Sequence, residues 1–573
     1  MQRTDSGIRL SATDLSHFLS CRHLTALDLA VAHRTREKPH RPEDPLLELL
    51  WQRGMDHEKA YVDSLRRDGR EVLDLNGIPR NQADEAIAQT LDAIRAGKDV
   101  IVQAALKHAS WFGYADILVR NDKESKLGAW SYEVIDTKLA RDTRAGTVLQ
   151  LGLYSAMLAE IQGTTPEQFH VVIPEPGHTT QISIPFRVDD YSAYMRLMQR
   201  ELLRATEMES DELAQLHYPE PADHCDICGW RRTCDEKRHA DDHLSLVAGL
   251  GRLHRRELAS QGVNTLAAYA GMTLPFKTKR GSKESYARYQ QQALVQLSSR
   301  DAPAMAYKLR PPEPPPKDPM QLVERRGLSR LPEPSPGDVF LDLEGDNYAD
   351  EDGREYLFGI TTLEADGSEQ YHKWWAFTAA EERVAFESVM DFIMGRLEHD
   401  PNMHVYDFAP YEPTAFKRLM GRHATREGEL DRLLRGGRFI DLLAVVRQSM
   451  WAGVESYSIK RLEPLYRFTR DVNLPDASHS LRRMEYALQV KQPALVIDAD
   501  REIILGYKED DCVSTLKLRD WLETLCAEAE AQGIPCPDMS DDELLEERQA
   551  VAGLTRLARE GNLPGSFCAR LGL

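Results

Sequence analysis

The sequence predicts an α/β protein with two mixed halves and a helical segment between them. Helix-like and strand-like segments alternate over residues 11–186. A strand at 338–344 opens the second half, and a long helix near 503–528 closes it. Nine prolines between residues 308 and 337 disfavour both helix and central strand, so we expect a linker at 307–336. The chain, at 573 residues, is too long for one ordinary core.

The elements of the first half follow from the period of the apolar residues. We expect helices at 11–35, 44–68 and 82–97, and strands at 99–106, 111–120, 130–140, 169–174 and 180–186. Residues 241–300 are helical, and two short helices meet at Gly262-Val263. This pair resembles a helix-hairpin-helix unit that grips the DNA backbone, and an ordinary pair of antiparallel helices explains it equally well. The predicted organisation is a domain at 1–240, a helical segment at 241–306, a linker at 307–336, a domain at 337–530 and a tail at 531–573.

Composition and charge exclude some classes of protein. No apolar run approaches the roughly 18 residues that a membrane helix needs, so we expect no membrane partner. The opening MQRTDSGIRL lacks the basic and then apolar pattern of a secretory signal, which predicts a cytoplasmic protein. The net charge of −20 argues against a simple nucleic-acid coat, although local basic patches or bound cations can reverse the repulsion.

The stretch WSYEVIDTKLA, residues 130–140, places Asp136 and Lys138 on one side of a predicted strand. The preceding strand carries Asp116, three positions after Gly113. Clustered carboxylates repel one another unless a cation holds them, and hard oxygen ligands suit Mg²⁺ or Mn²⁺. Such a site activates water against a phosphodiester, and a neighbouring lysine positions that water. A simple salt bridge between Asp136 and Lys138 is the structural alternative.

Three further residues extend this pattern: His57 on a predicted helix upstream, and Gln150 and Tyr154 on one helical face downstream. The order His, G-x-x-D, D-x-K, Q-x-x-x-Y resembles the PD-(D/E)XK nucleases of the RecB-like family, which have a restriction-endonuclease-like fold. Asp136 stands where that family more often has glutamate, and either carboxylate binds Mg²⁺. The resemblance implies metal binding by His57, Asp116 and Asp136, catalysis by Lys138, and substrate support by Gln150 and Tyr154.

Four cysteines form a pattern typical of a metal site. The stretch HCDICGWRRTC contains Cys225, Cys228 and Cys234, and Cys21 lies near the start of the chain. A subset of RecB-like nucleases binds a [4Fe–4S] cluster with one early and three late cysteines, and the order here resembles theirs. That resemblance favours iron–sulfur over zinc and implies a structural staple between the first helix and the end of the domain. Zinc remains the alternative, completed by His224, His239 or His243.

A second pair of acids opens the other half, in GDVFLDLEGD. Asp342 and Glu344 stand two apart on a strand and share a face. Near the end, LGYKEDDCVSTLKLRDWLETLC places Tyr507 and Asp511 on the apolar stripe of a helix. A buried lone carboxylate is costly, so Asp511 needs a cation or a hydrogen-bond donor.

The pairing of D-x-E with Y-x-x-x-D resembles DnaQ-type 3′–5′ exonucleases of the RNase H-like fold, which hold two metal ions with four acids. In HVYDFAPYEPTAFKRL we assign the remaining acid to Glu412 and keep Asp407 in reserve. Asp441 either supports the site or caps the end of a strand. The resemblance implies metal binding by Asp342, Glu344 and Asp511, and positioning of the attacking water by Tyr507.

Residues 8 to 525 as a whole resemble proteins in which an iron–sulfur RecB-like half precedes a YprB-type RNase H-like half. The resemblance implies a metal-dependent nuclease that trims single-stranded DNA ends, with RNA possible for the second half and a role in DNA repair or defence. The chain lacks G-x-x-x-x-G-K-[ST], so unwinding would need a helicase partner. The rival hypothesis is a nucleic-acid-binding scaffold with a structural metal cluster, in which one or both centres are inactive.

Overall fold

The computed structural model describes residues 1–5, 7–40, 45–140, 143–175, 180–274, 277–311, 326–350 and 352–531. The chain forms two compact units: the first is Met1–Ala240 and the second begins at Asp241. The helical segment after residue 240 packs with the C-terminal half. No helix within these described ranges is both long and apolar enough to cross a membrane.

The N-terminal unit is built on a six-stranded mixed sheet of order β3-β4-β5-β6-β7-β8. Its strands are β3 Val72–Asp74, β4 Val100–His108, β5 Trp111–Asn121, β6 Ser131–Thr137, β7 Gln168–Pro174 and β8 Gln181–Arg187. The pairs β3–β4 and β6–β7 are parallel, and the other neighbours are antiparallel. A separate two-stranded sheet pairs β1 Gln2–Thr4 with β2 Gly7–Arg9.

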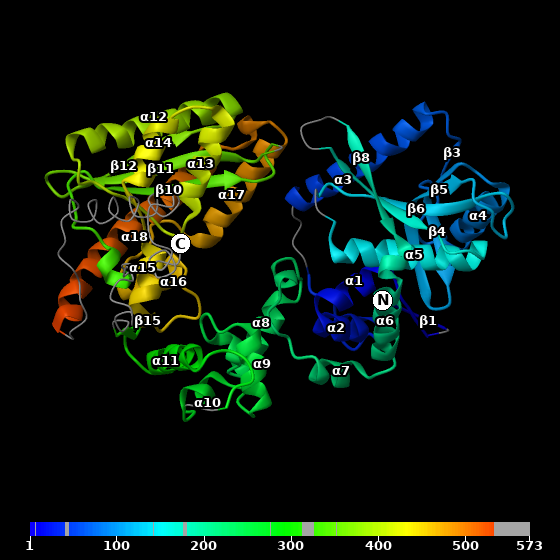
Figure 1. Cartoon of the computed structure of the whole chain (residues 1–573), viewed down its shortest axis with the longest axis horizontal. Helices are drawn as coiled ribbons and strands as arrows, with labels where there is room; N and C mark the ends of the chain where they lie inside the picture. Colours follow the sequence, from blue (N-terminus) through cyan, green and yellow to red (C-terminus); the bar gives the residue numbers. More distant parts are fainter. Residues whose placement is uncertain are drawn as a thin grey trace, which may run out of the picture. The chain divides into compact units, whose positions relative to one another are not determined.

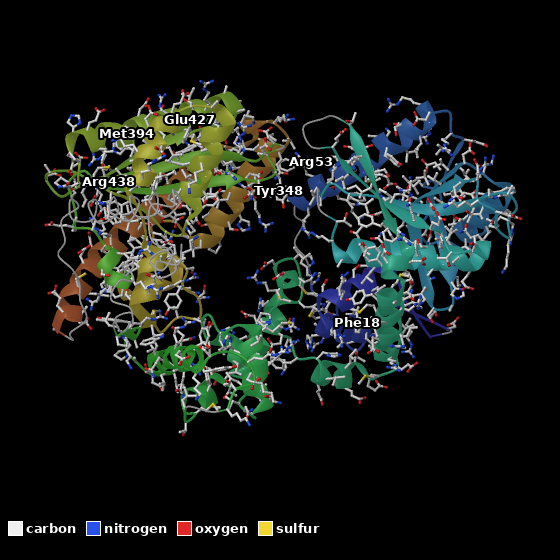
Figure 2. The ribbon with its side chains drawn as sticks, viewed as in Figure 1. Phe18, Arg53, Tyr348, Met394, Glu427 and Arg438 are labelled. Carbon is white, nitrogen blue, oxygen red and sulfur yellow. The ribbon has the colours of Figure 1, made fainter. Side chains whose placement is uncertain are left out.

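Helices cover both faces of this sheet, as Figure 1 shows for α3 and α5. They are α1 Ala12–Ser20, α2 Arg22–Ala32, α3 Pro45–Arg67, α4 Ala83–Ala96, α5 Ala145–Gln162, α6 Val188–Thr206, α7 Ser210–Leu216 and α8 Arg231–Ala240, with a 3₁₀ turn η1 at Asp223–Asp226. The larger core lies between the sheet and α1, α4, α5 and α6, and it includes Phe18, labelled in Figure 2. A smaller core under α3 includes Val62.

Two predicted elements of this unit end earlier in the structure than the sequence predicts. The single helix expected at 11–35 breaks at Cys21, whose backbone is extended (φ −158°, ψ 108°). A capping box between Ser11 and Asp14 begins α1. The strand expected to reach residue 140 ends at Thr137, and Lys138 follows it directly. The backbone N–H of Lys138 still donates to the carbonyl of Val172 (2.8 Å), so its position stays tied to β7.

The C-terminal unit contains a five-stranded sheet of order β12-β11-β10-β13-β14. Its strands are β10 Val339–Asp346, β11 Arg354–Leu363, β12 Glu369–Trp375, β13 Val405–Asp407 and β14 Phe439–Asp441. Along β10, Leu341 and its odd-numbered neighbours join the core under α12, whereas Phe340 joins the core under α15 and α18. Because side chains alternate along a strand, Asp342 and Glu344 point to the α18 side.

Helices lie on both faces of the C-terminal sheet, with α12 and α18 on opposite sides (Figure 1). The helices are α9 Arg252–Ser260, α10 Leu266–Ala270, α11 Lys283–Arg300, α12 Ala379–His399, α13 Tyr411–His423, α14 Glu427–Arg435, α15 Leu442–Ser449, α16 Ile459–Leu462, α17 Leu474–Gln489 and α18 Asp498–Ala531. The 3₁₀ turns are η2 Leu244–Leu246, η3 Gly327–Arg330, η4 Glu463–Leu465 and η5 Pro493–Leu495. The short helices α9 and α10 are separated at Gly262, which has a positive φ of 81°.

Both ends of the predicted linker belong to the fold, which corrects the sequence interpretation. Strand β9, Tyr307–Leu309, precedes the first proline of the segment and pairs with β15, Met450–Ala452. At the other end, Leu328 and Leu331 are buried in the core under α15. Burial of these apolar side chains stabilises the fold, and the described prolines Pro311, Pro332, Pro334 and Pro336 lie outside strands. The prolines at the centre of the segment lie in residues 312–325, and the tail lies beyond residue 531; both stretches fall outside the described residues.

A buried ion pair ties α18 to the first strand of its sheet. Arg519 Nη1 lies 2.7 Å from Asp338 Oδ2, and each side chain is 3% exposed. The guanidinium carbon of Arg519 lies 4.9 Å from the centre of the Phe340 ring and 5.1 Å from that of Tyr406. This contact sets the distance between α18 and β10, which carry acids on their facing sides.

We expect Arg519→Met to lower the free energy of unfolding around α18 by about 3–5 kcal/mol, because it leaves the Asp338 carboxylate buried without its cation. Native-state hydrogen exchange of the α18 amides measures this free energy, because these amides report on the C-terminal unit and not on the N-terminal one. The control is Arg435→Met, which removes an exposed arginine paired with Asp431 and should leave that exchange nearly unchanged. Equal exchange in both variants would contradict the prediction.

Candidate functional site

Two acids of the N-terminal sheet face each other, as the sequence predicts. The antiparallel register of β5 and β6 ends with Ile117 opposite Ile135, and one step further lie Asp116 and Asp136. Asp136 is only 1% exposed. Burial raises its pKa well above the ordinary value, and the charge and hydrogen bond of Asp116 raise it further. Two carboxyl groups placed in this way must share a proton or hold a cation.

Lys138 and Gln150 join this pair of acids. Lys138 Nζ lies 2.7 Å from Asp136 Oδ2, and Gln150 Nε2 donates to Asp136 Oδ1 at 3.4 Å. Burial alone would lower the pKa of Lys138, but the charges of Asp136, Asp116 and Glu58 raise it above its ordinary value. The side chain of Lys138 is 35% exposed, so its ammonium reaches both the acids and the solvent.

Tyr154 lies against the strand that carries Asp116. A Cβ built on Gly113 would lie 2.7 Å from the Tyr154 hydroxyl, so a glycine is needed there for the ring to fit. Burial raises the pKa of Tyr154, and the charges of Asp116 and Asp136 add to the effect. The structure therefore gathers five of the six predicted residues of this first centre.

His57 lies beside the centre, at the carbonyl of Val172 that also accepts from the backbone N–H of Lys138. Its Nε2 lies 3.3 Å from the carbonyl of Val172, and its Nδ1 lies 2.8 Å from Gln181 Nε2. Both ring nitrogens are thus engaged in these contacts, and the role of His57 as a metal ligand stays a prediction. Burial lowers the pKa of His57, which keeps the imidazole neutral in this contact.

Glu58, the next residue of α3, is an acid close enough to Asp116 and Lys138 to interact with their charges, and the sequence analysis missed it. Burial raises the pKa of Glu58, and the charge of Asp116 raises it further. Gln103 Nε2 donates to its carboxylate at 3.0 Å. Neighbouring residues of a helix point about 100° apart, so sequence alone could not decide which of the two faces the sheet.

The four predicted cysteines line one small cavity in the N-terminal unit. Cys21 lies at the junction of α1 and α2, and Cys225, Cys228 and Cys234 follow through η1 into α8. Burial raises the pKa of Cys234 to about 11, and the charges of the other three thiols contribute to the shift. This coupling shows that all four sulfurs lie near one another, which suits a shared metal or cluster.

The histidines proposed to complete a zinc site differ in position. His224 lines the cysteine cavity. His239 Nδ1 lies 2.9 Å from the carbonyl of Asp235, and His243 Nδ1 lies 2.9 Å from the Ser245 hydroxyl. Four cysteines are a complete donor set for either metal, so no histidine is required.

A lysine that the sequence analysis did not select lies at the heart of the C-terminal centre. Lys508 Nζ is 2.5 Å from Asp342 Oδ2, 2.6 Å from Glu344 Oε2 and 3.8 Å from Asp511 Oδ2. Burial alone would lower the pKa of Lys508, but these three charges raise it well above its ordinary value. Its position three residues before Asp511 on α18 was the signal in the sequence.

Two further acids lie beside Asp342, and their oxygens lack partners. Asp407, at the end of β13, is fully buried, and neither of its carboxyl oxygens has a hydrogen bond. Glu412, in the first turn of α13, has an unpaired Oε2. Burial raises the pKa of Asp407 to about 8, with contributions from Asp441 and Asp342. Burial also raises the pKa of Glu412, followed by the charges of Asp342 and Asp407. The preferred and the reserve candidate therefore both lie at the centre.

Asp511 and Tyr507 lie on the same stripe of α18, as predicted, and each contacts a cation. Asp511 Oδ1 accepts a hydrogen bond from Arg470 Nη2 at 2.6 Å. The Tyr507 hydroxyl accepts from the ammonium of Lys460. Burial raises the pKa of Tyr507, and the charge of Asp511 adds to the shift. Asp511 thus has the cationic partner that its burial requires.

Asp441 acts as a cap. It is the N-cap residue of α15, and its Oδ1 accepts from the backbone N–H groups of Ala444 (3.1 Å) and Ala409 (3.0 Å). Its charge also contributes to the raised pKa of Asp407. Capping therefore explains its conformation, and it influences the centre through Asp407.

The chemistry of these donor sets fits metal binding, although the side chains are not yet arranged around an ion. Among the residues that the structure describes, no three His, Cys, Asp or Glu side chains converge closely enough to hold one metal ion. The unpaired oxygens of Asp407 and Glu412 are hard ligands whose burial is costly without a cation. The group that now lies between Asp342 and Glu344 is the ammonium of Lys508.

Comparison with known families identifies the C-terminal part. Residues 339–523 match the family model described as RNase_H superfamily. The match runs from β10 into α18 and contains every predicted residue of the second centre, so this part of the chain is an RNase H-like domain. A search of curated proteins finds no match to the chain.

The raised pKa of Asp407 predicts that stability depends on pH when divalent ions are absent. The folded carboxyl has a pKa of about 8, and an unfolded aspartate has one near 3.9. Between these values the native state binds a proton that the unfolded chain has lost, so the free energy of unfolding falls as pH rises. The expected loss is up to about 1.4 kcal/mol per pH unit.

Asp407→Asn should remove this dependence, because the amide does not titrate. Hydrogen exchange of β13, corrected for the pH dependence of the intrinsic rate, should show the wild type losing stability relative to the variant between about pH 5 and pH 7. A difference that stays constant over that range would show that Asp407 is already ionised in the folded protein.

Proposed function

We propose that the chain is a metal-dependent nuclease that hydrolyses phosphodiester bonds of DNA, acting as an exonuclease on single-stranded ends. The observation that carries the proposal is the gathering of Asp342, Asp407 and Glu412 in the segment that matches the RNase_H superfamily. Buried carboxyl groups with unpaired oxygens are costly for folding, so their presence there is best explained by a function.

In the C-terminal centre the proposed ligands of Mg²⁺ or Mn²⁺ are Asp342, Glu344, Asp511 and the third acid, Glu412 or Asp407. The bound ions supply a polarised phosphoryl oxygen and a water with a lowered pKa. Tyr507 is placed beside Asp511 to orient that water. This centre is proposed to act in the 3′–5′ direction, with RNA as a second substrate.

In the N-terminal centre the proposal is a PD-(D/E)XK active site. Asp116 and Asp136 would hold the metal, and Glu58 is better oriented than His57 to complete the set. Lys138, which reaches both acids and solvent, would hold the attacking water or shield the phosphate. Gln150 and Tyr154 would keep the acids and the substrate strand in place, since both contact this centre.

The four cysteines are proposed to bind a [4Fe–4S] cluster that joins the α1–α2 junction to α8. Zinc needs four sulfurs within roughly 4 Å of one another, whereas a cluster holds them around a larger volume. The order of the cysteines, one before the strands of the first centre and three after them, supports the cluster. Thiols of this kind stay reduced in the cytoplasm, where we place the protein. We propose that it acts there with a helicase partner in DNA repair or defence.

One observation favours a second candidate function, a nucleic-acid-binding scaffold, for the C-terminal half. The ammonium of Lys508 already forms ion pairs with Asp342 and Glu344, so these two acids have a cationic partner without a metal ion. A scaffold would retain such a centre for stability alone. The two functions differ in whether changes to these acids abolish cleavage.

We expect Asp136→Asn and Lys138→Ala each to reduce Mn²⁺-dependent cleavage by the N-terminal centre by about 10²–10³-fold, because each removes charge that acts on the phosphate. The measurement is the release of labelled nucleotides from single- and double-stranded DNA and from RNA. Asp342→Asn tests the C-terminal centre in the same assay. Lys123→Ala, an exposed lysine paired with Glu167, is the matched control for Lys138→Ala. Full cleavage by Asp136→Asn, Asp342→Asn and the double variant alike would favour the scaffold.

The protein purified without oxygen should contain about four iron and four sulfide ions per chain, with a broad visible absorption that dithionite bleaches. Cys228→Ser should lose this absorption, because the cluster would lack one ligand. Cys526→Ser, a change in the C-terminal unit, should retain it. One zinc ion per chain without iron would refute the cluster and support zinc.

A further inference from the structure

We infer that Lys508 is a built-in cation of the C-terminal centre, which occupies the position that a divalent ion must take and thereby weakens metal binding there. The inference rests on the proposed function of this centre and describes its regulation. Three carboxylates from two elements surround one ammonium: Asp342 and Glu344 from β10, and Asp511 from α18. This is the donor set that hard divalent cations prefer.

The ammonium is held in the protein interior. The Lys508 residue is 2% exposed, and its Nζ also donates to the carbonyl of Leu343 at 3.0 Å. Its stripe of α18 continues through Cys512 and Thr515 to Arg519, and these are all buried. The Arg519–Asp338 ion pair fixes the register of this stripe against β10. Lys508 therefore cannot leave the acids by a simple rotation into solvent at its own position on the helix.

The charges of the centre are divided unevenly. On the α18 side each acid has a cationic partner: Lys508 contacts Asp342 and Glu344, and Arg470, which also pairs with Glu463, contacts Asp511 at 2.6 Å. On the other side, the oxygens of Asp407 and Glu412 have no such partner. A divalent ion that enters between Asp342 and Glu344 must displace a charge already in contact with both, and it is repelled by that charge until it does.

The contrast with the N-terminal centre supports this interpretation. Lys138 contacts one acid, Asp136, and is 35% exposed, so it can move aside for an ion or a phosphate. Lys508 lies between three acids with a side chain that is 3% exposed. The same residue type thus assists one centre and blocks the other.

The test is a titration of the full-length chain with Mn²⁺, in which free Mn²⁺ is measured by electron paramagnetic resonance. Binding at this centre is the difference between each chain and the same chain carrying Asp342→Asn. We expect Lys508→Met to bind Mn²⁺ at this centre about tenfold more tightly than the wild type, or better, because the competing charge is gone. Lys517→Met, a change on the same helix at a lysine paired with Glu369, should bind as the wild type does.

Lys508→Gln is the second variant, because it keeps a hydrogen-bond donor among the acids if Lys508→Met does not fold. Equal affinities in Lys508→Met or Lys508→Gln and in the wild type would overturn the inference. The inference would also be overturned if the wild type, with Lys508 intact, binds Mn²⁺ tightly and Asp342→Asn abolishes that binding.

The failure of this inference and that of the proposed function are distinguishable. If Lys508→Met binds Mn²⁺ tightly but no chain cleaves nucleic acid, the built-in cation stands and the nuclease function fails. If wild type and variant bind Mn²⁺ equally and Asp342→Asn abolishes cleavage, the nuclease stands and the inference fails.

Discussion

Buried carboxyl groups can lie together only if a cation or a shared proton offsets their like charge, and much of this structure follows from that constraint. In the N-terminal unit the antiparallel register of β5 and β6 forces Asp116 and Asp136 together, and Lys138 supplies the positive charge. In the C-terminal unit the alternation along β10 turns Asp342 and Glu344 toward α18, where Lys508 meets them. Each centre thus exists because regular secondary structure places acids closer than their charges alone would allow.

The acids of the two centres are paired with cations to different extents. In the N-terminal centre a single, partly exposed lysine pairs with Asp136, whose own side chain is buried. The C-terminal acids are covered by α18, and Arg470 adds a second buried cation at Asp511. Among the described residues of this centre, both carboxyl oxygens of Asp407 and Oε2 of Glu412 are buried without a hydrogen bond. The acids of the RNase H-like domain therefore have cationic partners beside α18, whereas these oxygens beside β13 and α13 have none.

The cysteine cavity shows how far local patterns predicted the site. The spacing C-x-x-C-x₅-C is local, so a turn followed by a helix brings Cys225, Cys228 and Cys234 together whatever the rest of the chain does. Cys21 joins them only because the predicted helix 11–35 breaks there. That break depends on packing against α7 and Trp230, which no local pattern contains.

The sequence by itself determined the α/β architecture and the pairs Asp136–Lys138, Asp342–Glu344 and Tyr507–Asp511, because strand alternation and helical spacing act between near neighbours. Only the tertiary structure decided that Glu58 lies near the first pair of acids, that Lys508 fills the second centre, and that the ends of the proline-rich segment join the fold. These outcomes depend on which distant surfaces pack together. Which of two neighbouring helix residues faces the core, and whether one leucine is buried, depends on packing energies between distant segments. No short stretch of sequence determines those energies.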